Sequence, residues 1–310
     1  MLCARVAAID MGSNAIRLRI VEIGSANMPR VGRSLLDEQR YNVRLGLATY
    51  GQGRLDEPSI TAALSALRTC RESCRNHGVT RYRAVATAAL RDAPNGGELV
   101  RRAREELGLV IEVIPGDEEA RLLYLGLAAR DREGGPVAMI ELGSGSLQVA
   151  AGSGERATLL DSLPLGGLRL ALEFGARDAL APERLAAMQA AIRAGLAATT
   201  ARLRALPVRR LLGAGGGFRA VAVLTGDRAP VTLALDQARA LTARLAPLGL
   251  QQRVALGLPV DRADSVTPAA CLSAELIELL GLTGMDLVDT NVRDGILADL
   301  AADPARGGAL

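Results

Sequence analysis

Two short stretches of the chain each combine an acidic residue with a Gly- and Ser-rich turn between apolar strands. They are AIDMGSNAIRL (residues 8–18) and MIELGSGSLQV (residues 139–149). A tight turn of this composition directs backbone N–H groups and hydroxyls toward one point, which is typical of an anion-binding nest. Asp10 and Glu141 stand at the hinges of the turns, where each is suited to hold a hydrated cation against a bound phosphate. The candidate phosphate-binding residues of the turns are Gly12, Ser13, Asn14, Gly143, Ser144, Gly145 and Ser146.

The two turns belong to an internal repeat. Residues 6–18 align with residues 137–149 without a gap, at a constant offset of 131. The matched positions are Val6/Val137, Ala7/Ala138, Ile9/Ile140, Asp10/Glu141, Gly12/Gly143 and Ser13/Ser144. Asn and Ser also form ordinary hairpin turns, so one copy alone would indicate only a turn. Two copies with an acid at the same place favour phosphate binding in two domains that begin alike.

Two further clusters could contribute to a site. Asp117, Glu118 and Glu119 open a predicted helix, where acids complement the helix dipole and where one of them could act as a general base for water. The segment LLGAGGGFRAV (residues 211–221) contains a third Gly-rich turn, and the N–H groups of Gly215 and Gly216 could face a phosphate or a nucleotide. It does not match a dinucleotide-binding fingerprint, because Phe218 occupies the position of the third glycine.

The elements that must position these residues follow a repeated order. Each half is predicted to have a hairpin and a third strand, followed by alternating helices and strands. In the first half these are a strand within 29–46, helices at 56–78, 95–108 and 117–130, and strands at 80–89 and 109–116. In the second half they are strands at 156–165, 208–214 and 285–290, and helices at 181–206, 218–226, 269–281 and 292–303. This order predicts an α/β fold with two mixed sheets, and a cleft between the domains that faces both turns.

Composition narrows the function classes. The chain has 310 residues, enough for two domains, and all 37 basic residues are Arg, which excludes Schiff-base lysines and the P-loop lysine. A net charge of +3, 2% aromatic residues and no Trp argue against nucleic-acid binding by charge or base stacking. No apolar run approaches membrane-spanning length, so we expect a cytoplasmic protein with no membrane partner. Cys70, Cys74 and His77 could share a helix face as metal ligands, but packed cysteines and a surface histidine are favoured.

Taken together, these stretches resemble the exopolyphosphatase/guanosine pentaphosphate phosphatase family, within the actin–hexokinase–Hsp70 superfamily. AIDMGSNAIRL and IELGSGSLQV look like its two phosphate loops, and IPGDEEARLLYLGL is similar to its most diagnostic motif. Segments that resemble the rest of the family pattern, in the expected order, are AVATAALRDAPN, LPLGGLRLALEF, LLGAGGGFRAVA, LPVDRADSVTPAACL and NVRDGIL. The resemblance covers nearly the whole chain and leaves no region for the additional helical domain of longer members.

The resemblance implies two actin-like (ribonuclease H-like) domains, residues 1–127 with 291–310 and residues 128–290. It also implies Mg²⁺-dependent release of terminal phosphate from inorganic polyphosphate, or of the γ-phosphate from guanosine pentaphosphate, by direct attack of water. In that scheme Asp10 and Glu141 hold the metal, Arg91 and the turn N–H groups bind phosphoryl oxygens, and Glu119 is the base.

The second turn departs from the family pattern. Glu141 replaces an Asp, Ser144 a Gly, and Gln148 a Glu that would complete the catalytic set, while Gly217 in the third turn replaces a Thr. Gln148 cannot accept a proton but can still orient a water. If the missing carboxylate limits turnover, Gln148→Glu should raise it.

Three functions therefore stay open at this stage. The first is an active hydrolase, and the second is a binding protein that senses polyphosphate or guanosine tetra- and pentaphosphate without hydrolysing them. The third, a sugar or acetate kinase of the same superfamily, is disfavoured because no sugar-binding acidic motif occurs. A homodimer is the commonest closed assembly and is expected on that ground alone.

Overall fold

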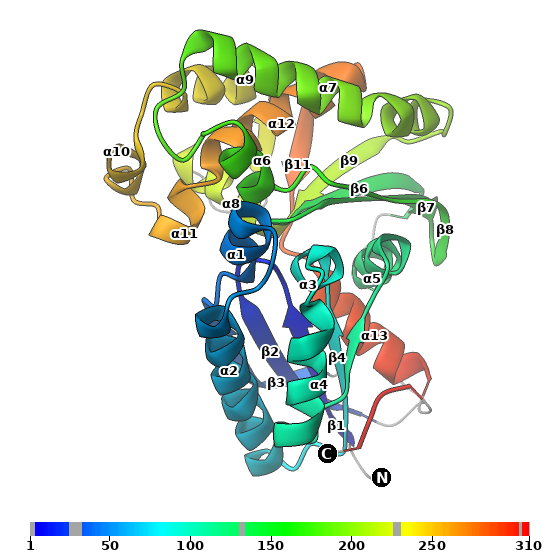
Figure 1. Cartoon of the computed structure of the whole chain (residues 1–310). Coiled ribbons are helices and arrows are strands. Elements are labelled where there is room, and N and C mark those ends of the chain that lie inside the picture. The colour runs from blue at the N-terminus through cyan, green and yellow to red at the C-terminus, as the bar shows by residue number, and fades with distance from the viewer. Residues whose placement is uncertain (1–3, 25–32, 130–133, 226–230, 304–305, 310) are drawn as a thin grey trace. The chain divides into compact units, whose positions relative to one another are not determined.

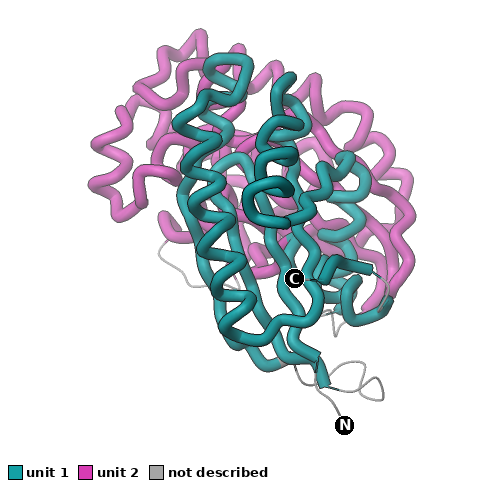
Figure 2. Tube along the Cα trace, turned by 60° about the horizontal axis from the view of Figure 1, so that its bottom comes forward, with its two compact units in different colours: residues 1–130, 292–310 teal, residues 131–291 magenta. Residues whose placement is uncertain are grey.

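The computed structural model describes residues 4–24, 33–129, 134–225, 231–303 and 306–309. The chain divides into two compact units, which Figure 2 shows in different colours. Unit 1 contains residues 1–130 and 292–310, and unit 2 contains residues 131–291. Each unit has a hydrophobic core of its own, built mainly from aliphatic side chains.

The described strands of unit 1 form one mixed sheet (Figure 1). They are β1 (Ala4–Met11), β2 (Ile16–Ile23), β3 (Arg33–Tyr41), β4 (Arg81–Ala86) and β5 (Ile111–Val113). The strand order is β3-β2-β1-β4-β5, in which the first two pairings are antiparallel and the last two are parallel. The central strand β1 is buried from Val6 to Met11, as expected for a strand covered on both faces.

The described helices of unit 1 are α1 (Leu45–Gln52), α2 (Glu57–Asn76), α3 (Ala88–Asp92), α4 (Gly96–Leu107), α5 (Gly116–Ala128) and α13 (Val292–Ala302). Helix α2 begins where the sequence predicts, because the Asp56 carboxylate accepts a hydrogen bond from the Ser59 N–H at 2.9 Å. Helix α13 packs against α5, and a Cβ at Gly295 would lie 1.7 Å from the Leu122 carbonyl oxygen. The close approach of these two helices therefore requires glycine at position 295.

The described strands of unit 2 are β6 (Pro136–Leu142), β7 (Leu147–Ser153), β8 (Arg156–Leu163), β9 (Arg210–Ala214), β10 (Val231–Ala234) and β11 (Gly284–Leu287). Their order is β10-β11-β9-β6-β7-β8. From β8 to β11 this sheet repeats the order and the strand directions of the sheet in unit 1. The repeat confirms the prediction of two mixed sheets in an α/β fold.

The described helices of unit 2 are α6 (Gly167–Glu173), α7 (Pro182–Arg204), α8 (Gly215–Leu224), α9 (Leu235–Leu245), α10 (Leu250–Val254), α11 (Val260–Ala263) and α12 (Val266–Leu279). Helix α12 is buried from Val266 to Ile277 and forms much of the core. Helices α1 and α6, and the segment from β10 to α11, were not predicted. The predicted strand at 80–89 was wrong at its end, since α3 begins at Ala88. Residues 29–32 of the predicted third strand lie outside the described residues.

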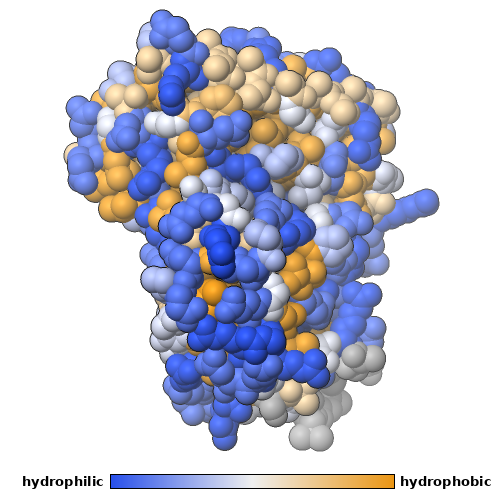
Figure 3. All heavy atoms as spheres, in the orientation of Figure 1, coloured by the Kyte–Doolittle hydropathy of each residue, from blue (hydrophilic) through white to orange (hydrophobic). Residues whose placement is uncertain are grey.

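Helix α2 has an exposed face and a buried face that carries Cys70 and Cys74. In Figure 3 the face of unit 1 over α2 and α4 is largely hydrophilic. Cys70 and Cys74 are buried in the core, where burial raises the pKa of each thiol to about 12. His77 ends α2 with Nδ1 2.9 Å from the Ser73 carbonyl oxygen, so the packing interpretation of these residues is confirmed. None of the described helices has the length and apolar character needed to cross a membrane.

Candidate active site

The two Gly- and Ser-rich turns adopt the same backbone hydrogen bonding. In the first turn the Gly12 N–H donates to the Ala15 carbonyl oxygen at 3.1 Å. In the second turn the Gly143 N–H donates to the Ser146 carbonyl oxygen at 3.0 Å. The donor and the acceptor are related by the same offset of 131 residues, so the predicted repeat is confirmed at the level of individual bonds.

In unit 1 the residues at the start of α1 bind the carbonyl groups of the first turn. The Gly46 N–H donates to the Ser13 carbonyl oxygen at 2.7 Å, and the Arg44 N–H donates to that of Asn14 at 2.9 Å. A Cβ at Gly46 would lie 3.0 Å from the Ser13 Cβ, so glycine allows this close approach. The Ser13 hydroxyl oxygen also lies 3.1 Å from the Tyr50 hydroxyl oxygen.

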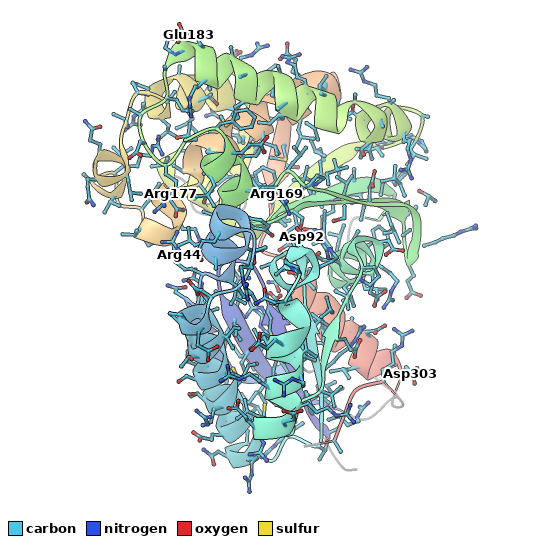
Figure 4. The ribbon with its side chains drawn as sticks, viewed as in Figure 1. Arg44, Asp92, Arg169, Arg177, Glu183 and Asp303 are labelled. Atoms are coloured by element: carbon cyan, nitrogen blue, oxygen red, sulfur yellow. The ribbon has the colours of Figure 1, made fainter. Side chains whose placement is uncertain are left out.

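In unit 2 the start of α6 binds the second turn in the corresponding way. The Leu168 and Arg169 N–H groups donate to the Ser144 carbonyl oxygen at 3.0 and 3.1 Å. The Arg169 side chain, labelled in Figure 4, adds a bond from Nε to the Gly145 carbonyl oxygen at 2.8 Å. A Cβ at Gly166 would lie 2.2 Å from the Gly145 carbonyl carbon, so this contact is tighter than its counterpart in unit 1.

These helix starts orient the N–H groups of both turns. In a trans peptide the C=O of one residue and the N–H of the next point in opposite directions. Because the carbonyls of Ser13 and Asn14 face residues 44–46, the N–H groups of Asn14 and Ala15 are directed away from that segment. The same reasoning directs the N–H groups of residues 145 and 146 away from α6. Each turn thus presents successive donors on one side, which is the geometry of an anion-binding nest.

Asp10 lies at the end of β1, just before the first turn. It is buried, with 8% of the residue exposed, and its Oδ2 accepts a hydrogen bond from Arg17 Nη1 at 3.3 Å. Asp10 and Arg17 are directly opposed in the β1–β2 register. The buried carboxylate therefore has a cationic partner within the same hairpin.

Glu119 lies in the first turn of α5, and its carboxylate pairs with an arginine. Arg91, in α3, donates from Nη1 to Glu119 Oε2 at 3.1 Å and to the Ile114 carbonyl oxygen at 3.0 Å. Glu119 is 6% exposed. Unit 1 therefore pairs the predicted site residues Arg91 and Glu119, and Asp10 is near enough for its charge to act on Glu119.

The surroundings of Glu119 shift the pKa of its carboxyl group into the neutral range. Burial raises the pKa of Glu119 to about 7, and the negative charges of Asp10 and Asp92 add to the rise. Arg91 opposes the shift through its charge and its hydrogen bond. Asp92, labelled in Figure 4, is the last residue of α3. A carboxyl group with this pKa can accept a proton near pH 7 and release it again.

The neighbouring acid, Glu118, has a different role. Successive residues of a helix point about 100° apart, so Glu118 and Glu119 cannot face the same partners. Glu118 accepts hydrogen bonds from Arg83 Nη2 at 3.1 Å and from Arg121 Nε at 2.5 Å. Burial acts to raise the pKa of Glu118, but these two arginines together lower it below its usual value. Arg83 is itself buried and also donates to Asp299 in α13 at 2.9 Å. This ion-pair network fixes the start of α5, and Asp117 is exposed.

In unit 2 the second turn is flanked by Glu141 and Gln148, which are opposed in the β6–β7 register. Gln148 is 1% exposed, and its Nε2 donates to the Ser146 hydroxyl at 2.7 Å and to the Ser162 hydroxyl at 3.2 Å. Unit 2 thus brings Glu141, Gln148 and the second turn together, with an amide where an acid was expected from the resemblance.

The third Gly-rich segment begins α8 directly. Gly215 has φ of +91°, and a Cβ there would lie 2.8 Å from Glu141 Cγ. A Cβ at Gly216 would lie 2.0 Å from Arg262 Nη1, so a guanidinium group lies against the start of this helix. At Gly217 a Cβ would lie 2.6 Å from Leu142 Cδ2, which explains why a larger residue is absent there.

Sequence reasoning missed several residues that contact these predicted site residues. They are Arg17, Tyr50, Ser162, Arg169 and Arg262. The repeat aligns Arg17 with Gln148 at the offset of 131, and Arg169 and Arg262 lie in two of the segments that resemble the family. All of them except Arg17 come from segments distant in sequence, and only tertiary packing brings them to the turns.

Comparisons with known proteins identify relatives of this chain. The model of the Ppx/GppA phosphatase family matches residues 24–303. Exopolyphosphatase 1 of Mycobacterium tuberculosis is 27% identical over 318 residues, which covers 99% of this chain and 91% of that protein. The solved structure of the Aquifex aeolicus Ppx/GppA enzyme is similar, with a TM-score of 0.80, 26% identity and coverage of 96% of this chain and 100% of that one.

A solved exopolyphosphatase from Cytophaga hutchinsonii supports the fold. It has a TM-score of 0.86 and 24% identity, and the match covers 96% of this chain and 98% of that one. The match spans both units, so the two mixed sheets are those of the actin-like fold class predicted from the sequence. On the match of the family model over most of its length, this chain belongs to the Ppx/GppA phosphatase family.

Proposed function

We propose that this chain is a hydrolase that releases terminal phosphate from inorganic polyphosphate, or the γ-phosphate from guanosine pentaphosphate, by direct attack of water. The observation that carries the proposal is the buried Glu119, which has a pKa of about 7 and is held by Arg91 beside the first turn. A family member built only for binding would not need a buried carboxyl group that titrates near neutral pH.

In this proposal Glu119 is the general base. Near pH 7 a substantial fraction of Glu119 is ionised, and the carboxylate takes a proton from the attacking water. Arg91 has two roles: it holds Glu119 Oε2, and its guanidinium offers further donors to phosphoryl oxygens. Positioned donors and charges of this kind stabilise the charge that spreads over the phosphoryl group in the transition state.

The two turns are the proposed phosphate-binding elements. The contacts with α1 and α6 direct successive N–H groups of each turn away from the adjoining helix. The side chains of Ser13, Ser144 and Ser146 add hydroxyl groups to the turns. In unit 2 the start of α8, at Gly215 and Gly216, adds the positive end of a helix beside the second turn. The guanidinium of Arg262 next to Gly216 increases the positive potential there.

Mg²⁺ is the proposed cofactor, and the donor set of the chain fits this ion. Among the described residues no group of three or more His, Cys, Asp or Glu side chains could hold a metal by itself. Mg²⁺ does not require such a cage, because it keeps several waters and binds through one or two carboxylates plus substrate phosphates. The carboxylate of Asp10 in unit 1 and that of Glu141 in unit 2 are each a proposed ligand for such an ion. When bound, the ion would neutralise charge on the phosphoryl oxygens.

A sensor without turnover is the second candidate, and Gln148 is the observation that favours it. Its amide donates to two hydroxyl groups and cannot accept a proton from water. If the chemistry required an acid at this position, the chain would bind polyphosphate or guanosine tetra- and pentaphosphate without hydrolysing them.

Release of inorganic phosphate distinguishes the two candidates. Purified chain would be incubated with Mg²⁺ and either polyphosphate or guanosine pentaphosphate, with Glu119→Gln as the matched variant. The hydrolase proposal predicts release that falls by about 10²–10⁴-fold in the variant, the usual contribution of a general base. Binding by both proteins with no release from either would support the sensor instead.

A further inference from the structure

The side chain of Gln148 is the starting point. It is almost completely buried, with 1% exposed, although an amide carries two donor hydrogens and an acceptor oxygen. Buried polar groups are costly unless they are hydrogen-bonded. Here Nε2 contacts two hydroxyl oxygens, those of Ser146 in the turn and Ser162 in β8. Gln148 and Ser162 are directly opposed in the β7–β8 register, so the strand pairing itself places the second contact.

These contacts determine what the Ser146 hydroxyl can do. A serine hydroxyl has one hydrogen to donate and lone pairs that accept. Because Ser146 Oγ accepts the bond from Gln148 at 2.7 Å, its hydrogen does not point toward Gln148. Ser146 lies in the second turn, and its N–H is among those directed away from α6. Although only 4% of Ser146 is exposed, its hydroxyl hydrogen is left for an acceptor other than Gln148, and a ligand bound by the turn can be that acceptor.

We infer that Gln148 is a positioning residue that makes the Ser146 hydroxyl a donor to a phosphoryl oxygen and keeps the second turn free of another negative charge beside Glu141. The inference rests on the proposed function, because it takes a phosphoryl group as the ligand of this turn. The amide is then not a degraded acid. It is the group around which the anion-binding side of unit 2 is arranged.

A carboxylate at this position would reverse both features. Ionised Glu has no donor, so the Ser146 and Ser162 hydroxyls would turn their hydrogens toward it. The turn would lose one donor to the ligand and gain a buried negative charge that repels phosphate. We therefore expect Gln148→Glu to weaken phosphate binding, and not to raise turnover as it would if a missing acid limited the reaction.

The first test measures affinity against pH in a Glu119→Gln background, which prevents turnover and removes the titration of that residue. Isothermal titration calorimetry with tripolyphosphate, at constant Mg²⁺, would compare Gln148 with Gln148→Glu between pH 5 and pH 8.5. We expect the ratio of the two Kd values to increase with pH as the new carboxyl group ionises, and to reach at least about tenfold at the upper end. Gln251→Glu, the same change at an exposed position of α10, should leave Kd unchanged at every pH.

The second test remains decisive if the buried Glu prevents folding. It is a double-mutant cycle with Gln148→Met, which keeps the length of the side chain but has no donor, and Ser146→Ala. If Gln148 acts through Ser146, the double variant binds tripolyphosphate no more weakly than Ser146→Ala alone. A merely structural role for Gln148 would make the two losses multiply, and that result would overturn the inference.

The remaining outcomes separate the inference from the function on which it rests. Equal Kd values for Gln148 and Gln148→Glu across the pH range would overturn the inference and leave the proposed function intact. Absence of tripolyphosphate binding in the Glu119→Gln protein and in the wild-type chain would overturn the proposed function, and the inference with it.

Discussion

In each unit three directly opposed residues form a row across the first three strands, and the side chains in this row differ between the units. In unit 1 the row is Asp10, Arg17 and Arg40 across β1, β2 and β3. In unit 2 it is Glu141, Gln148 and Ser162 across β6, β7 and β8. Each row begins with an acid, but the acid is ion-paired with arginine in unit 1 and is opposed by a neutral amide in unit 2.

The difference is consistent with separate proposed roles for the two copies of the hairpin. Unit 1 combines its charged row with Glu119 and Arg91, which are the groups suited to proton transfer and charge stabilisation. Unit 2 surrounds its turn with hydroxyl and amide groups, which are suited to binding an anion. The repeated backbone therefore keeps its hydrogen bonds while one side-chain position, 17 or 148, changes the charge beside the turn.

Removing the acid of each row should have the largest and most unequal effects. Asp10→Asn removes the partner of Arg17 and the proposed metal-binding carboxylate beside Glu119, so we expect kcat to fall by about 10²–10³-fold. Glu141→Gln should cost roughly tenfold, because the residue opposed to Glu141 is a neutral amide and not an arginine. Phosphate release measured over a range of Mg²⁺ concentrations would show the difference. Equal losses would mean that the two rows share one role.

The next effect concerns the helices that hold the turns. Gly166→Ala would place a Cβ 2.2 Å from the Gly145 carbonyl carbon, so the second turn or α6 must move. We expect about 1–3 kcal/mol of lost stability and a several-fold weaker affinity for tripolyphosphate. Gly46→Ala, where the nearest contact is 3.0 Å, is the matched variant in unit 1 and should be milder. A larger effect at Gly46 would show that the tightness of the contact does not control the turns.

Stability against pH should separate the two neighbouring acids of α5. The pKa of Glu119 is raised from 4.5 to about 7, so its contribution to stability is present below pH 4.5 and is lost as pH rises to 7. The wild-type chain should therefore lose this stability between pH 5 and pH 8, whereas Glu119→Gln has no carboxyl group to ionise. The difference obtained by subtracting the Tm of the wild type from the Tm of Glu119→Gln should increase over this range. Glu118 has a lowered pKa, so its contribution is already present above its ordinary value.

Glu118→Gln is therefore the control for that experiment. It should lower Tm by a nearly constant amount from pH 5 to pH 8, because the ion pairs to Arg83 and Arg121 are formed throughout this range. Thermal unfolding of the three proteins at several pH values is the measurement. Parallel pH profiles for the two variants would contradict the separate roles of Glu118 and Glu119.

The smallest expected effect tests whether the first turn also uses a side chain from outside it. Tyr50→Phe removes the hydroxyl that lies 3.1 Å from Ser13 Oγ. One neutral hydrogen bond contributes about 1 kcal/mol, which corresponds to a roughly fivefold change in affinity for tripolyphosphate. The change should be smaller than that for Gln148→Glu, because no charge is introduced. An equal or larger loss would give Tyr50 the role that we assign to Gln148.

Much of the fold could be predicted because it depends on local patterns. The hairpins of β1–β2 and β6–β7 follow from alternating apolar residues and turn chemistry, and helices such as α2 from their periodicity and caps. Helices α1 and α6 were missed because they are short, with eight and seven residues, and contain glycine. Their role, which is to bind the carbonyls of the turns, exists only after residues far apart in sequence have packed.

The sequence likewise indicated the residues of the candidate site but not the partners that their side chains contact. Composition and the repeat pointed to both turns, and the resemblance chose Glu119 among three adjacent acids. The rotation of a helix by one residue decides that Glu118 meets Arg83 while Glu119 meets Arg91, and the sequence alone does not reveal this. In the same way, the bonds of Gln148 to two serines depend on strand register, so an alternative to its interpretation as a missing acid could be proposed only with the structure.

The pH dependence of kcat/KM for phosphate release tests the central claim most directly, since that claim places the proton acceptor in unit 1. At saturating Mg²⁺, activity should rise with pH and reach half its maximum near pH 7, as expected if ionised Glu119 accepts the proton from water. An acidic limb near pH 4.5, or a rate in Glu119→Gln that follows the same profile at the same level, would contradict the account.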